Sequence, residues 1–356
     1  MNRLACIAGL LALGATYPPN VLEFAARYEL VVQPPAGSQR VRIWFPVPRE
    51  EPAQEISALE IESPVPYRVT RDPRGNQLVY LEADPASEEI RVVATFDVRR
   101  REVAASTDPE QTRAYRPEDL RGREHWLEPD KHVVINERIR ELAAKITAGE
   151  TNPVRAARSI YDWMLENVDY WVKEPALKSA SKVGSTTYCL DTGTGNCTDF
   201  HSLYASLARA AGIPTRILYG SLFKPELDGK DLDASYHCWL EFYAPAIGWI
   251  PVDVAVADIY HGAIDIDEDN RSLVSRTTAD GYDGPDPRKV EYYFGHLEPR
   301  RVTWTEGRDL ALEPPQAGGP VNALPKAYVE VDGAPLQEGN GWKRRFTYVS
   351  RNVGGS

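Results

Sequence analysis

The sequence predicts an α+β protein in which helices pack on an antiparallel sheet, with an N-terminal β-sandwich domain. Proline and glycine make up about 15% of the 356 residues, which implies many turns and favours β-rich architecture over a helical bundle. Short strand-like runs separated by turns fill residues 20–104, and helical stripes followed by strand-like runs fill residues 131–285. We therefore expect a sandwich over 20–104, a polar linker over 105–130 and an α+β core over 131–285. A β-rich segment, 286–356, is expected to pack on the core.

The composition excludes two broad classes of protein. The chain has 41 Lys and Arg against 52 Asp and Glu, a formal net charge of −11. Nucleic-acid binders neutralise phosphates with a basic face, so this balance argues against a nucleic-acid partner. The 8 Trp, 18 Tyr and 8 Phe supply large surfaces that can be buried, and we expect a folded chain rather than a disordered one.

Residues 1–19 have the pattern of a signal peptide. Arg3 supplies positive charge, residues 4–15 are apolar and small, and a small-residue site at 12–14 precedes Pro18. The apolar run is too short to span a bilayer, and we expect no membrane span elsewhere. A buried N-terminal helix is the alternative. The sequence favours export, to the periplasm or outside the cell, because the charged start, the short apolar run and the proline break coincide.

The strands of the N-terminal domain follow from alternation and turn signals. Strand-like runs cover residues 23–32, 41–46, 67–70, 78–81 and 90–98. Asp72-Pro73-Arg74-Gly75-Asn76 is a hairpin turn signal between the third and fourth runs. No residue of this region indicates chemistry, so we expect a domain that packs against or positions the rest.

Helices and strands alternate differently in the core. A first helix has an apolar face from Val134 to Ile146 and ends at Gly149, and a second begins with Asn152 as N-cap and Pro153 in its first position. Strand-like runs then follow a third helix, at 216–222, 236–243 and 249–254, and further runs lie at 291–294, 302–305 and 328–331.

The third helix carries the first candidate catalytic residue. Asn196 or Thr194 can cap this helix, Cys197 lies in its first turn, and Gly212 ends it. The partial positive charge at a helix start favours the thiolate, which is the nucleophilic form of cysteine. Gly195 allows backbone and substrate to approach closely. The backbone N–H of Cys197 is a candidate oxyanion donor.

Two further residues complete a candidate catalytic triad. His237 lies on a strand-like run after the helix, and Asp253 lies on the next one. Neighbouring antiparallel strands can bring these two side chains together on one face. The carboxylate can then fix the imidazole tautomer while the other ring nitrogen faces Cys197.

Each of the three has a structural alternative. A cysteine at a helix start is usually a small buried hydrophobe, a histidine beside tryptophan is usually a core residue, and Asp253 could cap a turn. The ordered combination of helix-start Cys197, strand His237 and strand Asp253 favours catalysis, because triad chemistry needs all three in such places.

Four motifs in this region resemble the transglutaminase-like superfamily. They are Gly195-Asn196-Cys197-Thr198-Asp199, Gly212-Ile213-Pro214-Thr215-Arg216, His237-Cys238-Trp239-Leu240-Glu241-Phe242 and Gly248-Trp249-Ile250-Pro251-Val252-Asp253. The chain is most similar to the exported bacterial branch, whose members are cysteine proteases or amidases. The resemblance implies a papain-like α+β core, and it carries the family's triad over to Cys197, His237 and Asp253.

The resemblance also implies a reaction class. We expect cysteine-dependent acyl transfer at amide bonds of peptides or proteins, through a thioester on Cys197, with hydrolysis as the outcome. One alternative is a protein-glutamine transglutaminase that cross-links or deamidates. An alternative of another class is a non-catalytic binding or scaffold protein that kept the fold. No cofactor is expected.

Five nearby residues have weaker expected roles. Asp199 near the helix start and Arg216 are expected to be structural, the second through a carboxylate partner. His201 shares a helix face with Cys197 and is expected to be a buried partner rather than the general base. Tyr170 and Trp171 could line the cleft or simply pack.

Two metal sites are alternatives to these roles. A zinc ion could use Cys197, His201, His237 and Asp253, but the helix pair lacks a usual second ligand pair. Residues 265–270 begin like a calcium-binding EF-hand loop, yet Asn270 replaces the glycine at its sixth position and Arg276 the glutamate at its twelfth. A solvated acidic loop is favoured there, and no metal site is expected.

The cysteines give one further expectation. His237 and Cys238 are consecutive in a strand, so their side chains should point to opposite faces. If His237 faces Cys197, Cys238 cannot. Cys197 is therefore expected to be a free thiol, and Cys189 with Cys238 forms the candidate disulfide pair of the mature chain.

Overall fold

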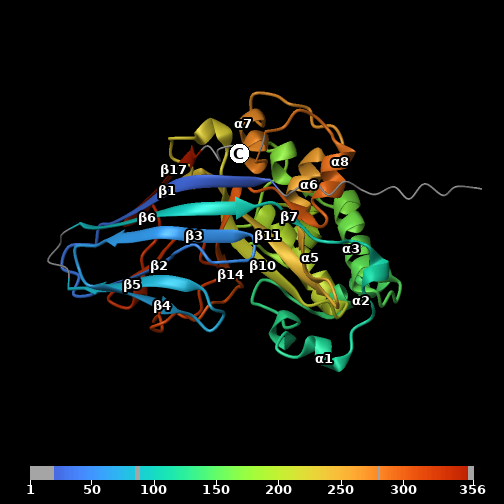
Figure 1. Cartoon of the computed structure of the whole chain (residues 1–356), viewed down its shortest axis with the longest axis horizontal. Helices are drawn as coiled ribbons and strands as arrows, with labels where there is room; N and C mark the ends of the chain where they lie inside the picture. The colour runs from blue at the N-terminus through green and yellow to red at the C-terminus, as the bar shows by residue number, and fades with distance from the viewer. Residues whose placement is uncertain (1–19, 85–88, 280, 352–356) are drawn as a thin grey trace, which may run out of the picture.

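The chain folds into a β-sandwich beside an α+β core (Figure 1). The computed structural model describes residues 20–84, 89–279 and 281–351, so the expected signal peptide lies outside the described residues. The core has helices packed on an antiparallel sheet, and the predicted fold class is confirmed. None of the described helices is long and apolar enough to cross a membrane.

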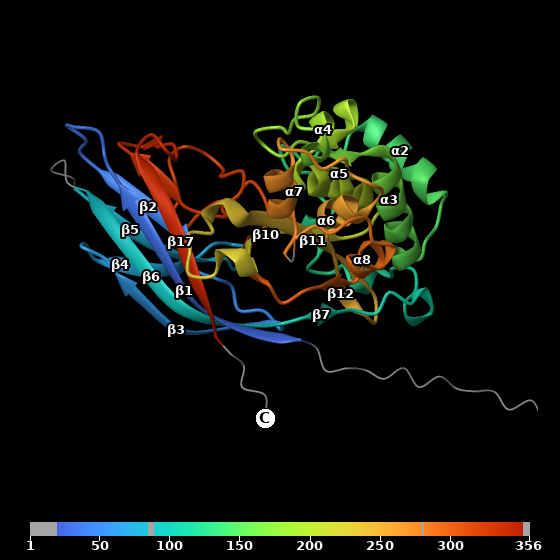
Figure 2. The ribbon, with the colours of Figure 1, turned by 90° about the horizontal axis from the view of Figure 1, so that it is seen from above.

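One sheet of the sandwich contains both the first and the last described strand, which lie side by side (Figure 2). The order is β17 (Trp342–Arg351), β1 (Val21–Val32), β6 (Ile90–Arg101) and β3 (Gln54–Glu62), antiparallel throughout. In β1, the side chains of Phe24, Ala26, Tyr28 and Leu30 are buried while those between them are more exposed. This alternation is the pattern that predicted the strand.

The second sheet of the sandwich is also completed by C-terminal strands. Its order is β16 (Ala334–Pro335), β15 (Tyr328–Val331), β2 (Val41–Pro46), β5 (Gln77–Ala83) and β4 (Tyr67–Arg71). The predicted turn joins β4 to β5, and the Asp72 carboxylate closes it by accepting hydrogen bonds from the backbone N–H groups of Arg74 and Asn76, each at 2.9 Å. The segment 286–356 thus adds strands to the sandwich as well as to the core. The proposed domain boundaries remain a prediction.

The core sheet joins the sandwich through its last strand. Its order is β12 (Gly248–Val252), β11 (Tyr236–Ala244), β10 (Thr215–Leu222) and β14 (Arg301–Glu306). Every residue of β14 is buried. Trp304 of this strand contacts the rings of Tyr28, Phe96 and Phe346 at centroid distances of 5.7, 5.8 and 5.0 Å. The apolar interior of the sandwich therefore continues onto the core sheet.

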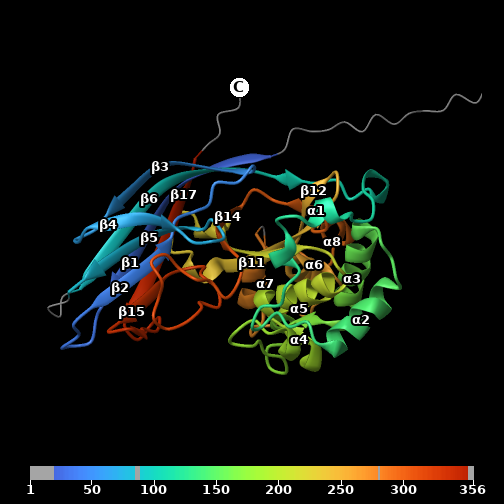
Figure 3. The same cartoon turned by 90° about the horizontal axis from the view of Figure 1, so that it is seen from below.

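The helices of the core begin at residues whose side chains cap them. They are α2 (Glu137–Thr147), α3 (Pro153–Asn167), α4 (Thr186–Thr192), α5 (Cys197–Ala210) and α6 (Val254–Tyr260). Asn152 caps α3 by accepting from the backbone N–H of Val154 at 3.1 Å, with Pro153 in the first position as predicted. Helix α5 is buried along almost its whole length, packed between the other helices and the sheet (Figure 3).

The remaining described elements are short. They are β7 (Val103–Ala104), η1 (Pro109–Gln111), α1 (Pro117–Leu120), η2 (Glu124–Trp126), β8 (Asp169–Tyr170), η3 (Trp171–Lys173), β9 (Thr194–Gly195), η4 (Pro225–Leu227), η5 (Asp233–Ser235), α7 (Arg271–Thr277), α8 (Pro287–Tyr292) and β13 (His296–Leu297).

Two differences from the sequence-based elements have local causes. The strand expected at 291–294 is wrong: these residues lie in and just after α8, which Asp286 caps and Pro287 begins. Strand β3 was not predicted, because most of its side chains are exposed and its apolar residues do not mark a face.

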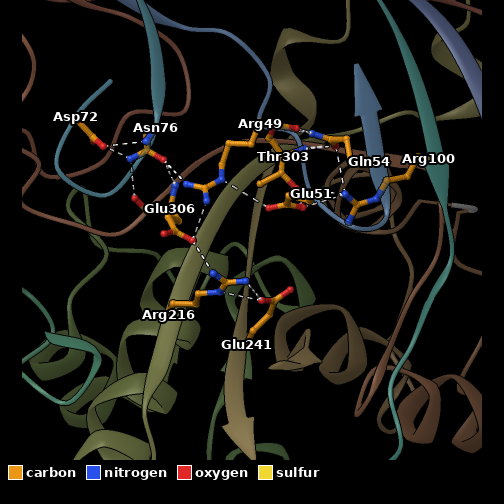
Figure 4. A network of polar contacts seen from close by, with 10 residues as sticks. All are labelled: Arg49, Glu51, Gln54, Asp72, Asn76, Arg100, Arg216, Glu241, Thr303 and Glu306. Carbon is orange, nitrogen blue, oxygen red and sulfur yellow. Dashed lines mark hydrogen bonds and ion pairs between the residues drawn. The ribbon is translucent and has the colours of Figure 1, made fainter. Parts of the chain in front are cut away.

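A polar network fills the interface between the sandwich and the core (Figure 4). Arg216 of β10 pairs with Glu241 of β11 at 2.7 Å and with Glu306 of β14 at 3.0 Å. Arg49 of the sandwich reaches the same Glu306 at 3.3 Å and donates to Asn76 at 2.7 Å. Arg216 therefore has the carboxylate partner expected from the sequence, and that partner set also joins the two parts of the molecule.

The same interface contains a glutamine that acts as a strand partner. Gln54 donates to the backbone carbonyl of Thr303 at 3.0 Å and accepts from its N–H at 2.9 Å. Its side-chain oxygen also accepts from Arg100 at 3.2 Å. These contacts tie the Gln54 side chain to the backbone of β14, where the carbonyl of Thr303 also accepts from the N–H of Arg49 at 3.1 Å.

Candidate active site

Cys197 is the first residue of α5. The side-chain oxygen of Asn196 accepts hydrogen bonds from the backbone N–H groups of Thr198 at 2.9 Å and Asp199 at 3.1 Å. In return, the Asp199 carboxylate accepts from the N–H of Asn196 at 3.0 Å. This reciprocal capping selects Asn196 over Thr194 and fixes Cys197 at the positive end of the helix.

Gly195 is required by the capping residue itself. A Cβ on Gly195 would lie 2.4 Å from the Cβ of Asp199, a separation that real side chains do not adopt. Asp199 also accepts from the backbone N–H groups of Ser181 at 3.0 Å and Ser185 at 2.7 Å. The carboxylate therefore ties the preceding loop to the start of α5.

His237 and Asp253 are in direct contact. The Nε2 atom of His237 lies 2.9 Å from Oδ2 of Asp253. His237 lies on β11, but Asp253 follows β12 instead of lying on a strand as expected. The chain turns into α6 at this point, because Asp253 caps that helix by accepting from the N–H of Val256 at 3.2 Å. One carboxylate thus ends a strand, starts a helix and holds an imidazole.

Cys197 and His237 lie close enough for each to change the ionisation of the other. Hydrogen bonds from Cys238 and His237, together with the His237 charge, hold the pKa of the Cys197 thiol well below its ordinary value, although burial opposes this. Burial lowers the pKa of His237, but the charge and hydrogen bond of Asp253 and the contact with Cys197 raise it to about 9. Both shifts favour the thiolate–imidazolium form of the pair.

Cys238 lies beside Cys197 rather than in a disulfide with Cys189. All three described cysteines are free and buried, so the expected pairing is wrong, whereas the expectation of a free Cys197 is confirmed. Cys238 faces α5, where its Sγ lies 3.4 Å from Nδ1 of His201. Alternation along β11 does not keep Cys238 from Cys197, because α5 begins against this strand and Cys197 contacts both Cys238 and His237.

Asp253 has two more buried partners. Arg301 donates to Oδ2 of Asp253 at 3.1 Å, and Glu298 holds the other side of the guanidinium at 2.6 Å. The Nε2 atom of His201 lies 3.7 Å from Oδ1 of the same carboxylate. Burial raises the pKa of Asp253, but His237, Arg301 and His201 together bring it well below its ordinary range. The carboxylate therefore stays ionised inside the protein.

The comparisons with known proteins concern this same region. Residues 140–254 match the sequence model of the transglutaminase-like superfamily, and they include Cys197, His237 and Asp253. This stretch of the chain is similar to the transglutaminase-like superfamily. A Pseudomonas aeruginosa protein-glutamine gamma-glutamyltransferase is 26% identical over 185 residues, which cover 46% of this chain and 26% of that protein.

Two further proteins are similar to this chain well beyond residues 140–254. A Haemophilus influenzae protein described only as uncharacterized is 27% identical over 390 residues, covering 99% of this chain and 100% of its own. A crystal structure of a candidate cysteine protease from Cytophaga hutchinsonii has a TM-score of 0.58 at 17% identity, covering 96% of this chain and 94% of that one. The second likeness shows that the fold is shared over nearly the whole chain.

The hydroxyl of Tyr170 binds a backbone group that is expected to act in catalysis. The backbone N–H of Cys197, a candidate oxyanion donor, donates to the hydroxyl oxygen of Tyr170 at 3.0 Å. A substrate carbonyl oxygen would have to replace that hydroxyl to use this donor. Trp171 is half-buried and packs against the core.

The sequence missed three residues around the candidate triad: Arg301 contacts Asp253, Glu298 holds Arg301, and Cys238 lies beside Cys197. Arg301 and Glu298 belong to the C-terminal segment, outside the residues that match the superfamily, and nothing in their local sequence marks them. Cys238 follows His237 directly in the sequence, but strand alternation predicts that its side chain points away from Cys197. His201 is fully buried beside Asp253 and Cys238, which agrees with its expected role as a buried partner.

The residues of the two alternative metal sites make other contacts in the structure. Over residues 20–84, 89–279 and 281–351, no group of three or more His, Cys, Asp or Glu side chains is placed to hold a metal ion. In the loop after residue 265, Asn270 accepts from the N–H of Asp267 at 3.0 Å and donates to the carbonyl of Asp265 at 2.7 Å. These hydrogen bonds close the loop from within.

Proposed function

We propose that the protein is a cysteine-dependent acyl-transfer enzyme that acts on amide bonds of peptides or proteins. Cys197 is the nucleophile, His237 the acid and base, and Asp253 the residue that orients the imidazole. Hydrolysis is the main outcome. The observation that carries the proposal is the grouping of Cys197, at the buried start of α5, with His237, whose Nε2 atom lies 2.9 Å from Oδ2 of Asp253.

The first half of the reaction forms a thioester. The Cys197 thiolate attacks the amide carbonyl carbon, and the carbonyl electron pair moves to oxygen. His237 binds Asp253 through Nε2, which leaves Nδ1 to give its proton to the departing nitrogen. The C–N bond breaks, an amine or ammonia leaves, and the acyl group remains on sulfur.

The second half releases the acyl group. Neutral His237 removes a proton from water, the oxygen attacks the thioester carbon, and the C–S bond breaks to give a carboxylic acid and the thiolate. Asp253 stabilises the imidazolium that forms in this step. Water needs no binding site of its own, which is why hydrolysis is the outcome we propose.

A second candidate is transfer to an amine. The likeness to the Pseudomonas aeruginosa gamma-glutamyltransferase favours it, since that protein's name describes transfer from protein glutamine. The same thioester serves both reactions, and an amine would replace water in the second half. We also propose export, on the pattern of residues 1–19.

The experiment uses the purified protein with glutamine-containing peptides and a labelled primary amine. Mass spectrometry separates three products: cleaved peptide, peptide in which the amide nitrogen is replaced by oxygen, and peptide carrying the amine. Cys197→Ala is expected to abolish all three, because no thioester can form. Cys189→Ala removes a buried thiol outside the site and is the matched control.

A second measurement covers substrates that these peptides do not represent. Iodoacetamide should alkylate Cys197 with an inflection well below the free-thiol value of about 8.5. Alkylation that follows an ordinary thiol pKa, with no product from any peptide, would establish a non-catalytic binding or scaffold protein instead.

A further inference from the structure

A groove of about 520 Å³ opens beside the start of α5. This volume lies within the range of about 300–1,000 Å³ that is usual for ligand clefts. One wall is the loop of residues 181–184, and the other is the C-terminal segment around Asn322 to Trp342. In Figure 3 this C-terminal segment (red) runs between the sandwich and the core. The floor includes Asn196 and Thr198, the two sequence neighbours of Cys197, and Tyr236, the neighbour of His237.

Thr198 connects the groove to the sulfur atom. Thr198 lines the floor, and its hydroxyl lies 3.9 Å from Sγ of Cys197 and makes a 2.9 Å hydrogen bond with the hydroxyl of Tyr236. A chain lying on this floor would therefore pass beside a residue that contacts the candidate nucleophile.

The two walls are held in place by a single buried arginine. Arg308 donates to the carbonyl oxygen of Gly184 at 2.7 Å on one wall and to the side-chain oxygen of Asn322 on the other. Gly184 has a φ of +67°, and a Cβ there would lie 2.2 Å from the Thr198 side chain. The glycine thus brings the first wall directly against the floor, and the groove is formed before any ligand arrives.

The groove has apolar side chains on both walls. Val183 on the first wall keeps 39% of its surface exposed, and Ala327 and Leu336 are half-buried on the second. Of the charged lining residues, Lys182 is exposed, while Lys326 is bound on both sides, by Asp233 and by Glu338, each at 2.7 Å. An elongated ligand whose uncharged side chains contact Val183 and Ala327 leaves the ion pairs of Lys326 in place.

We propose that this groove binds the acyl-donor segment of a peptide or protein substrate through uncharged side chains that contact Val183 and Ala327. The inference rests on the proposed function, because it places the substrate next to Cys197. It adds a binding site formed jointly by the core and the C-terminal segment.

The test compares two alkylating reagents of different length. Iodoacetamide and Ala-Ala-Ala-Ala chloromethyl ketone both form a C–S bond to Cys197, with loss of iodide or chloride, but only the second has a peptide portion. The variants Val183→Arg and Ala327→Arg obstruct the two walls. Val69→Arg, at an exposed valine of β4 that does not line the groove, is the matched control.

Both groove variants are expected to lower the rate of the peptidyl reagent about tenfold or more, a loss typical of a removed apolar contact. Their iodoacetamide rates should stay unchanged, which also reports an intact fold around Cys197. Equal loss with both reagents in both variants, or no loss with the peptidyl reagent, would overturn the groove assignment. Slow alkylation of the wild type by both reagents would instead count against the proposed function.

Discussion

Cys197 is a buried thiol whose ionisation depends on two neighbours, Cys238 and His237. It keeps only 4% of its surface exposed, and burial alone would disfavour the thiolate. A hydrogen bond from Cys238 and the hydrogen bond and charge of His237 outweigh this effect. In a site of low dielectric these short contacts act more strongly than in water. The pKa of Cys197 should therefore change when a single neighbouring side chain is replaced.

The Cys238→Ala substitution tests the first of these contacts. Without the hydrogen bond from Cys238, the pKa of Cys197 should rise, and the inflection of the iodoacetamide rate against pH should rise with it. Cys189→Ala is the matched control, because Cys189 is equally buried but lies in α4. An inflection that stays in place in a folded Cys238→Ala protein would mean that His237 alone sustains the thiolate.

Asp253→Asn tests the support of the imidazole. Asparagine keeps the shape and a hydrogen bond, but it removes the charge that raises the pKa of His237 to about 9. The falling limb of activity with pH should move down from pH 9, since imidazolium is lost earlier. The rising limb should move up, since Cys197 loses part of its cation. Turnover should fall by about 10²–10³-fold.

The measurement is kcat/KM and the alkylation rate, each across the pH range. This loss is smaller than the approximately 10⁴-fold effect of the same substitution in a serine triad, because a thiol ionises more readily. Unchanged turnover and alkylation in a folded Asp253→Asn protein would make Asp253 structural and reduce the triad to a dyad.

Helix α5 positions the thiol through its first turn. Asn196 and Asp199 satisfy N–H groups that no helical carbonyl can reach, and they hold Cys197 where those groups concentrate positive charge. This capping by Asp199 requires glycine at position 195, because any side chain there would collide with Asp199. The start of one helix thus determines both the position and the reactivity of the candidate nucleophile.

Asn196→Ala is expected to reduce both stability and reactivity. Loss of the cap should lower the free energy of unfolding by about 1 kcal/mol and slow alkylation of Cys197. Asn136→Ala is the control, because Asn136 caps α2 in the same way, at 3.0 Å from the N–H of Ile139, in another helix. Denaturant unfolding should give similar losses for the two variants, and only Asn196→Ala should change alkylation. Equal alkylation in both would exclude a specific role for this cap.

The whole molecule is joined by β14 and the polar network of Figure 4. Trp304 of β14 packs into the sandwich, while Arg301 of the same strand contacts Asp253. The strand therefore connects the sandwich interior to the candidate catalytic carboxylate over a few residues. We expect changes at the interface to affect the site through the position of β14.

Arg216→Met tests the network. It leaves Glu241 and Glu306 without their shared cation and should lower the free energy of unfolding by about 2–3 kcal/mol, somewhat less than for fully buried pairs. Adding Glu241→Leu should restore part of this loss, because a buried carboxylate is removed with its partner. Urea unfolding measures each variant.

The control for this prediction is an exposed ion pair. Arg40 and Glu82 pair at 2.8 Å with 54% and 39% of their side chains exposed, so Arg40→Met should change stability by less than about 1 kcal/mol. If Arg216→Met unfolds at the same urea concentration as Arg40→Met, the network does not stabilise the interface.

Local signals were sufficient for much of this protein. The Asn152-Pro153 helix start, the hairpin turn at 72–76 and the alternation of β1 depend on neighbouring residues, and the structure has all three. The candidate residues Cys197, His237 and Asp253 were also named from the sequence, because helix starts and strand ends are readable locally.

Only the tertiary structure could decide which distant groups surround them. Arg301 and Cys238 contact Asp253 and Cys197, and β17 joins β1, through pairings that depend on how the whole chain packs. Alternation in the sequence predicts toward which face of the sheet a side chain points. It does not predict which helix packs against that face. The disulfide prediction for Cys189 and Cys238 was wrong for this reason: local geometry was known, while the position of α5 relative to β11 was not.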